Sequence, residues 1–339
     1  MFFSACSTKE VFEPKDVQGF WQEPERKQSD IFPKVDKDSC GFVKYPKFDQ
    51  KIIDVTSQLA LLEDSKILTK KGILDVEVKE PYRLLGESDG WILSSTIDGN
   101  ITLDSIENNT TQEKFQLHKT IASASVKDDV LAVLFADNEM ALYSIATKEI
   151  LYKLQGNAPI VVDSRMVSPY FMNDLVLFLT LDGKIVIVNY ELKKKLRTII
   201  ISSEEYFNNV IYFNVIDNKL IAATGHKILS LASKEIRSNF EIRTIAYDNK
   251  DIFITTKQGE VISLTPSLEV NAKVKFPFAH FLGMILHNDK IYLLEKEGYI
   301  IELSKDLLTY SIYEVDFDDG YIFVQDDKFY VDNKIIPIE

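Results

Sequence analysis

A short pattern recurs along the chain and limits what the chain can fold into. It consists of three apolar runs separated by a tight turn and then a charged turn. The clearest copy runs from Asp174 to Tyr190 and continues into the apolar run at 196–202. Its tight turn is Asp182-Gly183, and an Asp-Gly pair between apolar runs predicts a β-hairpin. The runs are rich in β-branched and aromatic residues, which favour strands over a helix. The copy therefore predicts consecutive antiparallel strands.

Eight copies of this pattern can be aligned on a strand that we take as the second of each repeat. These strands are expected at 58–63, 90–96, 130–136, 174–180, 219–224, 251–256, 290–294 and 321–325. Self-similarity at a period of about 30–45 residues indicates a repeat architecture. Four short strands per repeat, closed into a ring, form a β-propeller. We therefore predict an all-β fold, an eight-bladed β-propeller of four-stranded antiparallel blades. The count falls to seven if the first or last copy is not a full blade.

The alignment also predicts which strands line the axis and which residues are buried. Inner strands are expected at 120–126, 209–216 and 281–287. The third-strand residues expected to be buried between blades are Leu142, Val186, Val188 and Leu264. A ring must close, because an open strand edge invites aggregation. Residues 48–55 and 334–339 could meet at the closure, but the pattern leaves open which strand completes which blade.

Composition and charge narrow the class of protein. The chain has 339 residues, 45% of them hydrophobic, which is ample for a large core. Length alone would suggest two domains, but the uniform repeat favours one ring. The net charge is -13, and no basic stripe with interleaved aromatics appears, so a nucleic acid is not the expected partner. The short basic cluster at 193–195 is expected to be a solvated hairpin turn. No apolar run is long enough to span a bilayer.

The N-terminus carries a possible anchoring signal. Phe3-Ser4-Ala5-Cys6 resembles a bacterial lipobox, in which signal peptidase II cuts before a Cys that carries a lipid. The segment departs from that pattern, because Phe3 replaces the usual Leu and the basic start and most of the apolar segment are missing. A start codon assigned too late or a trimmed chain would explain the gap. The alternative is an ordinary free Cys at a flexible terminus. We expect residues 1–6 to be a residual signal with lipidation at Cys6.

Residues 7–46 are polar and lack a clean period, so we expect a tether or extended arm ahead of a propeller at 47–339. The arm carries apolar residues that we expect to pack back onto the ring, although they could also anchor a partner: Phe20, Trp21, Ile31, Phe32 and Phe42. The two cysteines, Cys6 and Cys40, could form a disulfide in an oxidising compartment. If Cys6 is lipidated, Cys40 is left single. Two Cys and four scattered His form no zinc pattern, so no metal site is expected.

One copy carries a family resemblance. The third copy, at 139–154, resembles the repeat of the PQQ-like β-propellers: Ala141-Leu142 fits its Ala-Leu step, Thr147-Lys148 fits parts of Thr-Gly-Lys, and Tyr152 stands at the docking Trp. Each copy is degenerate, and within the ring Trp91 is the single remaining Trp. Two branches of that superfamily matter. Quinoprotein dehydrogenases bind PQQ and calcium on the ring axis, whereas BamB-like lipoproteins are inert outer-membrane scaffolds that assist β-barrel assembly.

The lipobox-like segment, the acidic ring and the eight copies together resemble the BamB-like branch. This resemblance implies a non-catalytic periplasmic scaffold lipoprotein without a cofactor, anchored by lipid, in the outer membrane of a Gram-negative bacterium. Its partner would be an envelope complex, either the outer-membrane assembly machinery or another periplasmic assembly. The alternative is a ligand-binding or PQQ-dependent propeller enzyme. Such an enzyme needs a basic and carboxylate cluster and calcium ligands. The longest gaps, at 155–165 and 202–208, show no such cluster in sequence, so no catalytic residue is assigned.

A second modification site is suggested in the second copy. Glu107, Asn109 and Thr111 resemble the extended acceptor of bacterial N-glycosylation, with an acidic residue two before the Asn and a hydroxyl residue two after it. The segment is polar and lies between predicted strands, where an enzyme could reach it. The alternative is a plain Asn/Thr-rich turn. Asn109 is therefore a candidate glycosylation site.

Overall fold

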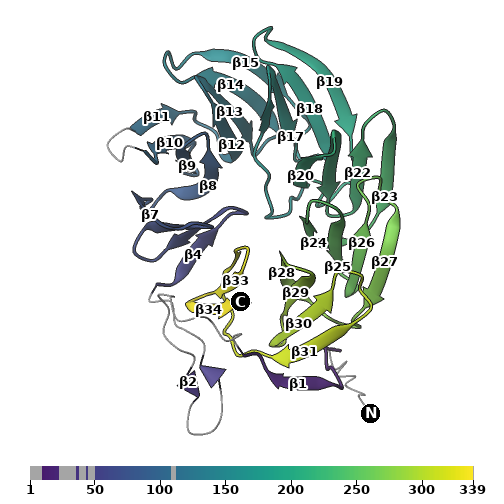
Figure 1. Ribbon diagram of the computed structural model, residues 1–339. Coiled ribbons are helices and arrows are strands. Elements are labelled where there is room, and N and C mark those ends of the chain that lie inside the picture. The colour runs from purple at the N-terminus through teal and green to yellow at the C-terminus, as the bar shows by residue number, and fades with distance from the viewer. Residues whose placement is uncertain (1–9, 23–35, 38–42, 45–49, 108–111, 339) are drawn as a thin grey trace, which may run out of the picture.

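The computed structural model of this protein describes residues 10–22, 36–37, 43–44, 50–107 and 112–338. In these ranges every regular element is a strand, and eight sheets are arranged as blades around a common axis (Figure 1). The prediction of an all-β, eight-bladed propeller is therefore confirmed. No helix long and apolar enough to span a membrane occurs among the residues described.

Each blade is a meander whose strands follow one another across the sheet in chain order. Blades 1 to 4 comprise β4 (Ile52–Val55), β5 (Leu59–Leu62), β6 (Lys66–Thr69), β7 (Gly72–Glu77); β8 (Arg83–Ser88), β9 (Trp91–Ser95), β10 (Asn100–Ser105), β11 (Gln112–Gln116); β12 (Ile121–Lys127), β13 (Val130–Phe135), β14 (Glu139–Ser144), β15 (Ile150–Gln155); β16 (Tyr170–Met172), β17 (Leu175–Leu179), β18 (Lys184–Asn189) and β19 (Lys194–Ile200).

Blades 5 to 8 comprise β20 (Val210–Ile216), β21 (Lys219–Thr224), β22 (Lys227–Leu231), β23 (Glu235–Asn239); β24 (Ile242–Tyr247), β25 (Ile252–Thr256), β26 (Glu260–Leu264), β27 (Val270–Lys275); β28 (Phe281–His287), β29 (Lys290–Glu295), β30 (Tyr299–Ser304), β31 (Tyr310–Glu314); β32 (Ile322–Val324), β33 (Lys328–Val331) and β34 (Lys334–Pro337). The first strand of a blade lies nearest the axis (Figure 1). The inner strands predicted at 120–126, 209–216 and 281–287 are β12, β20 and β28.

The meander divides the loops between two faces of the ring. Neighbouring strands in a blade are antiparallel, so each strand runs opposite to the one before it. The connections from one blade to the next therefore lie on the same face as the turns between second and third strands. We call this the linker face. The turns between first and second strands, and between third and fourth strands, lie on the opposite face.

A short sequence signature builds several turns of the linker face. In Thr96, Thr180 and Thr256 the hydroxyl accepts a hydrogen bond from the backbone N–H four residues later, at 3.2, 3.0 and 3.1 Å. Three residues after each Thr stands a Gly with a φ of 76° to 82°, a conformation that L side chains rarely adopt. At Gly259 a Cβ atom would lie 2.1 Å from the carbonyl oxygen of Phe276, so only Gly fits this turn.

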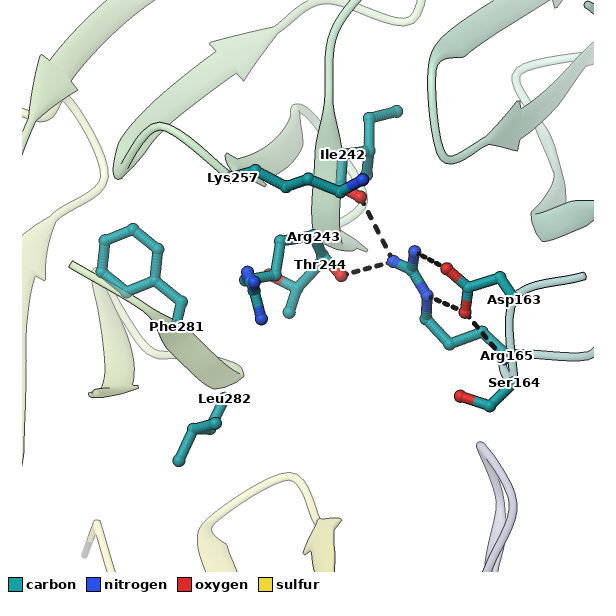
Figure 2. Close-up of a pocket in the computed structure, with 9 residues that line it drawn as sticks. All are labelled: Asp163, Ser164, Arg165, Ile242, Arg243, Thr244, Lys257, Phe281 and Leu282. Atoms are coloured by element: carbon teal, nitrogen blue, oxygen red, sulfur yellow. Dashed lines mark hydrogen bonds and ion pairs between the residues drawn. The ribbon is translucent and has the colours of Figure 1, made fainter. Parts of the chain in front are cut away.

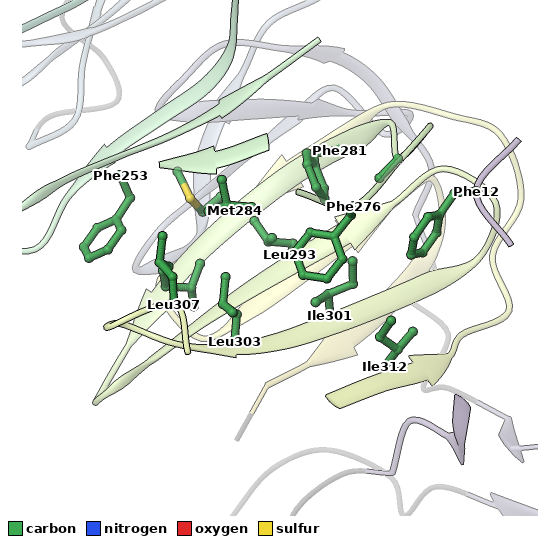
Figure 3. Packing of buried hydrophobic residues seen from close by; sticks show 13 residues of the cluster. Phe12, Phe253, Phe276, Phe281, Met284, Leu293, Ile301, Leu303, Leu307 and Ile312 are labelled. Atoms are coloured by element: carbon green, nitrogen blue, oxygen red, sulfur yellow. The ribbon is translucent and has the colours of Figure 1, made fainter. Parts of the chain in front are cut away.

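The core lies between the blades rather than at the axis. Leu142, Val188 and Leu264 are fully buried and Val186 is 5% exposed, which confirms their prediction as core residues. Second strands contribute large side chains to the same layers, for example Phe178 and Phe253. Figure 3 shows one layer, where Phe253 of blade 6 lies near Leu303 and Leu307 of blade 7.

The ring closes by packing of side chains between blades 8 and 1. Phe323, Tyr330 and Ile335 of blade 8 share a buried cluster with Ile52 and Leu62 of blade 1. Gln325 donates from Nε2 to the carbonyl oxygen of Thr69 at 2.6 Å, and this bond is also buried. Among the described strands none is exchanged across the seam, since β4 belongs to blade 1 and β34 to blade 8.

Blade 8 corrects one detail of the sequence alignment. The run at 321–325 was expected to be the second strand of its copy, but β32 is the first strand of blade 8. Short apolar runs look alike whichever strand they form, so the alignment of this copy was shifted by one strand. Blade 8 contains three strands in the described part of the chain, whereas blades 1 to 6 contain four.

Part of the N-terminal arm packs on the ring. Strand β1 (Val17–Phe20) pairs in parallel with β31, as a fifth strand of blade 7. Trp21 is 4% exposed and donates from Nε1 to the carbonyl oxygen of Pro337 at 2.9 Å, so it joins blades 7 and 8. Phe12 is also buried on blade 7 (Figure 3). The expectation that arm aromatics pack back therefore holds for Phe20 and Trp21, whereas Ile31, Phe32 and Phe42 lie outside the described residues.

Candidate functional site

Two long blade-to-blade connections meet on the linker face. The connection from blade 3 to blade 4 covers residues 156–169, and that from blade 4 to blade 5 covers 201–209. The first reaches inward from the outer strand of blade 3 toward the ring axis (Figure 1). These are the two gaps in which the sequence showed no functional cluster.

Buried asparagines hold the 156–169 connection in place. Asn209 is fully buried; its Oδ1 accepts from the backbone N–H of Asp163 at 2.7 Å, and its Nδ2 donates to the carbonyl oxygen of Arg165 at 2.9 Å. Asn138, also fully buried, donates to the carbonyl oxygen of Asn157 at 2.8 Å. If the connection moved away, these buried amide groups would lose their hydrogen-bond partners, which costs free energy. The connection is thus anchored from blade 3 by Asn138 and from the entry to blade 5 by Asn209.

Arg165 fixes the tip of this connection against blade 6. Its Nε donates to Oδ1 of Asp163 at 2.8 Å, Nη2 pairs with Oδ2, and Nη1 donates to the carbonyl oxygen of Arg243 at 2.6 Å (Figure 2). Burial alone would raise the pKa of Asp163, but the hydrogen bonds from Arg165 outweigh it and hold that pKa below its ordinary value. Asp163 is therefore ionised and neutralises Arg165.

A cavity of about 380 Å³ lies beside this ion pair. Its walls come from three parts of the chain that are far apart in sequence. They are the 156–169 connection, the start of β24 with the turn after β25, and the start of β28. Figure 2 shows the lining residues: Asp163, Ser164, Arg165, Ile242, Arg243, Thr244, Lys257, Phe281 and Leu282. The connection from blade 3 thus meets blades 6 and 7 across the ring.

The cavity is cationic although the protein is acidic overall. Arg165 is paired with Asp163, which leaves the charges of Arg243 and Lys257. Nη1 of Arg243 contacts Nε2 of His280, and its Nε is buried with no hydrogen-bond partner among the residues that the structure describes. Burial, with a contribution from nearby Arg165, lowers the pKa of Arg243. Lys257 is exposed and forms no ion pair with any described residue. Chemically, this arrangement can hold an anion.

An exposed apolar group adjoins the cavity. It consists of Ile160, Val161, Tyr206 and Phe207, which are 63%, 40%, 50% and 46% exposed. The backbone N–H of Phe207 donates to the carbonyl oxygen of Val161 at 3.0 Å, which joins the two connections. A Cβ atom on Gly225 would lie 3.5 Å from the carbonyl oxygen of Phe207 and 3.9 Å from Nη2 of Arg165. We call these four residues the apolar rim, and it borders the cavity wall.

The residues singled out in the sequence lie elsewhere. Cys6, Cys40 and Asn109 are outside the described residues. In the basic cluster at 193–195, Lys193 ends the turn between the third and fourth strands of blade 4 and the other two lysines begin β19; all three are exposed, on the face opposite the cavity. In the described ranges no group of three His, Cys, Asp or Glu is placed to hold a metal ion. Sequence reasoning missed the cavity, and the unusual length of the two connections was the one signal that pointed to it.

The fold has close structural counterparts. BamB from Moraxella catarrhalis is similar with a TM-score of 0.66 and 12% identity, over 85% of this chain and 96% of that one. The C-terminal WD40 domain of Sif2 is similar with a TM-score of 0.63 and 11% identity, over 88% of this chain and 100% of that one. At these identities the similarity establishes the fold alone. The class is thus an eight-bladed propeller with the fold of BamB.

Sequence comparison adds more particular relatives. The plasminogen-binding protein PgbB of Helicobacter pylori strain J99 is 38% identical over 196 residues, which is 57% of this chain and 36% of PgbB. PgbB of strain 26695 is 36% identical over the same length. The chain therefore matches about a third of the length of these relatives. No family model matches the chain.

Proposed function

We propose that this protein is a non-catalytic interaction propeller that binds a partner protein through its linker face. The apolar rim is the observation that carries this proposal. Large apolar side chains gathered on an exposed surface are typical of protein interaction sites. The rim is also anchored, because buried Asn209 and Asn138 fix the connection that carries Ile160 and Val161. A fixed apolar surface binds without a large ordering cost.

The partner surface that fits the rim is apolar with an acidic component. Tyr206 and Phe207 offer aromatic area, which is enriched at interfaces. Arg243 and Lys257 lie in the adjoining cavity and give this part of an acidic protein a local positive charge. Charge complementarity of this kind steers the encounter and selects the partner.

We further propose that the protein acts in the cell envelope of a Gram-negative bacterium. Cleavage before Cys6 would remove the signal-like residues ahead of it, a lipid on Cys6 would anchor the protein, and residues 7–46 would connect the anchor to the ring. The lipobox-like segment supports this proposal, and so does the shared fold with BamB. The partner would belong to the outer-membrane assembly machinery or to another periplasmic complex. Asn109 is proposed as an N-glycosylation site.

A cross-linking pull-down from membranes of the native host tests the interaction. The wild-type protein should recover envelope-complex proteins at stoichiometric levels. Ile160→Asp combined with Tyr206→Asp should abolish that recovery, because charges on the rim oppose apolar docking. Leu192→Asp is the matched control, since Leu192 is 70% exposed but lies on the opposite face. Equal recovery by the rim variant, or robust turnover of an alcohol with added PQQ, would contradict the proposal.

Mass spectrometry of the native protein tests the modifications. The expected form carries a diacylglyceryl group on an N-terminal Cys6. A soluble native form that begins at Met1 would exclude lipidation. Intact mass also tests Asn109, since an unmodified Asn109 in a glycosylation-competent strain would remove that site from the proposal.

Plasminogen binding is a second candidate function, favoured by the 38% identity to PgbB. Surface plasmon resonance with purified plasminogen tests it directly. Saturable binding that the rim variant loses would place plasminogen on the linker face. Absence of binding at micromolar plasminogen would reject this candidate and leave the envelope partner untouched.

A further inference from the structure

The cavity beside Arg165 has a chemical character that the apolar rim does not require. We propose that it is a binding site for the carboxylate of a small amphipathic organic acid. Arg243 and Lys257 would hold the carboxylate, and the apolar wall at the start of β28 would contact the hydrocarbon part. No step of this proposal uses the apolar rim, although the proposed partner interface takes its local positive charge from the same Arg243 and Lys257.

The two cations are available because the third is already neutralised. Arg165 donates to both oxygens of Asp163 and to two backbone carbonyls, so it has little capacity left for a ligand. The same bonds occupy the Asp163 carboxylate, which reduces its repulsion of an incoming anion. Arg243 and Lys257 therefore define the positive charge that a ligand meets.

Arg243 provides the most specific indication of an anion. It is half-buried in the cavity wall and forms no ion pair with any described residue, while its Nη1 faces Nε2 of His280. The Nε is enclosed by protein, so a ligand would meet the rest of the half-buried guanidinium, where a carboxylate oxygen can accept a charge-assisted hydrogen bond. Lys257, in the turn after β25, lines the same cavity and can reach the second oxygen with its flexible stem.

The size and walls of the cavity limit the ligand. A volume of about 380 Å³ is at the low end for small-molecule sites, which span roughly 300–1,000 Å³. Leu282 is half-buried in the wall, and Ile242 and Phe281, which are buried, also line the cavity. Two cationic side chains beside an apolar wall suit a carboxylate with a short hydrocarbon chain. Inorganic phosphate could pair with the same two cations, but it has no hydrocarbon part to contact the apolar wall.

Isothermal titration calorimetry of the purified chain tests the site with hexanoate as the probe. Hexanoate should bind at one saturable site, and neutral hexanamide should not bind. Lys257→Met should weaken hexanoate binding about tenfold, since it removes one charge-assisted hydrogen bond. Lys296→Met is the matched control, because Lys296 occupies the same turn position in blade 7 but does not line the cavity.

Arg243→Met should abolish hexanoate binding, with a thermal melt as the check on folding. If that variant fails to fold, Lys257→Met still tests the site, because Lys257 is exposed and its replacement should not disturb the fold. A dipeptide with a free C-terminal carboxylate, and its amide, distinguish the two sources of the ligand. Tighter binding of the acid dipeptide than of hexanoate assigns the site to a chain terminus, and the reverse order assigns it to a free acid. Equal affinity in the Lys257 and Lys296 variants, or tighter binding of inorganic phosphate, would overturn the proposal.

Discussion

Tyr330 illustrates how a single residue couples ring closure to pH. It is 5% exposed in the seam between blades 8 and 1, and its ring lies 6.3 Å from that of Phe323. Burial, with the nearby charge of Asp327, raises the pKa of Tyr330 from 10.0 to about 12. The fold therefore favours the protonated phenol. Its contribution to stability is complete below pH 10 and is lost as the pH rises through about 12.

Tyr330→Phe should remove this part of the alkaline loss of stability. The rise in the pKa of Tyr330 from 10.0 to about 12 corresponds to a loss of at most ~2.7 kcal/mol of unfolding free energy at high pH. Urea unfolding at pH 8 and at pH 11 should show that the wild type loses more stability than the variant between these values. The other tyrosines are common to both proteins and cancel in the comparison. Identical pH dependence of the two proteins would show that Tyr330 does not carry the effect.

The 156–169 connection is the element that builds the site. Connections of this length are commonly mobile. Here hydrogen bonds from buried Asn138 and Asn209, together with the Arg165 contacts to β24, fix it as part of the ring. Both the cavity and the apolar rim depend on this arrangement, since Asp163, Arg165, Ile160 and Val161 all belong to the connection.

Asn209→Ala should therefore loosen the connection while leaving the blades folded. It removes bonds to the backbone of Asp163 and Arg165, and we expect a loss of ~1–3 kcal/mol in unfolding free energy. Hydrogen–deuterium exchange should increase at 156–169. Asn214→Ala provides the control, because Asn214 lies on β20, the strand that follows Asn209, but bonds to Tyr212 and to the backbone N–H of Val215 instead. Unchanged exchange at 156–169 would mean that other contacts hold the connection.

At the scale of the whole molecule, side-chain packing joins blade 8 to blade 1, and the N-terminal arm joins blade 8 to blade 7. Trp21 packs against Tyr292 and Tyr313 of blade 7 with ring centroids 5.8 and 5.1 Å away, and it bonds to Pro337 of blade 8. Blade 8 has three strands in the described part of the chain, so it depends on its neighbours more than the other blades do. Trp21 is therefore placed to stabilise the last blade against separation.

Trp21→Ala should cost ~3–5 kcal/mol of unfolding free energy and should raise hydrogen exchange mainly in β32 to β34. Phe12→Ala is the control, because Phe12 is equally buried but packs against Phe276 and Tyr299, away from blade 8. That variant should destabilise the protein without a selective increase in blade 8. If both variants raise exchange evenly over all blades, the ring unfolds as one unit and the role given to Trp21 is wrong.

The sequence by itself determined the features that depend on residues close to one another along the chain. Alternation of apolar residues and the Asp182-Gly183 turn are local, and they predicted the hairpin of blade 4 and the burial of Val186 and Val188. Repetition of the same local pattern was enough to count the blades. It was not enough to identify β32 as a first strand, because the position of a strand within a blade depends on its neighbours in space.

The tertiary structure alone decided the site. Arg165 bonds to the backbone of Arg243, 78 residues later in the chain, and both line a cavity with Leu282. No local pattern marks these residues, because their proximity results from the ring bringing blades 6 and 7 opposite the connection that leaves blade 3. The anion-binding character proposed for the cavity is likewise a property of this assembly, since it depends on which cation Asp163 neutralises and on the placement of Arg243 and Lys257 in the same wall.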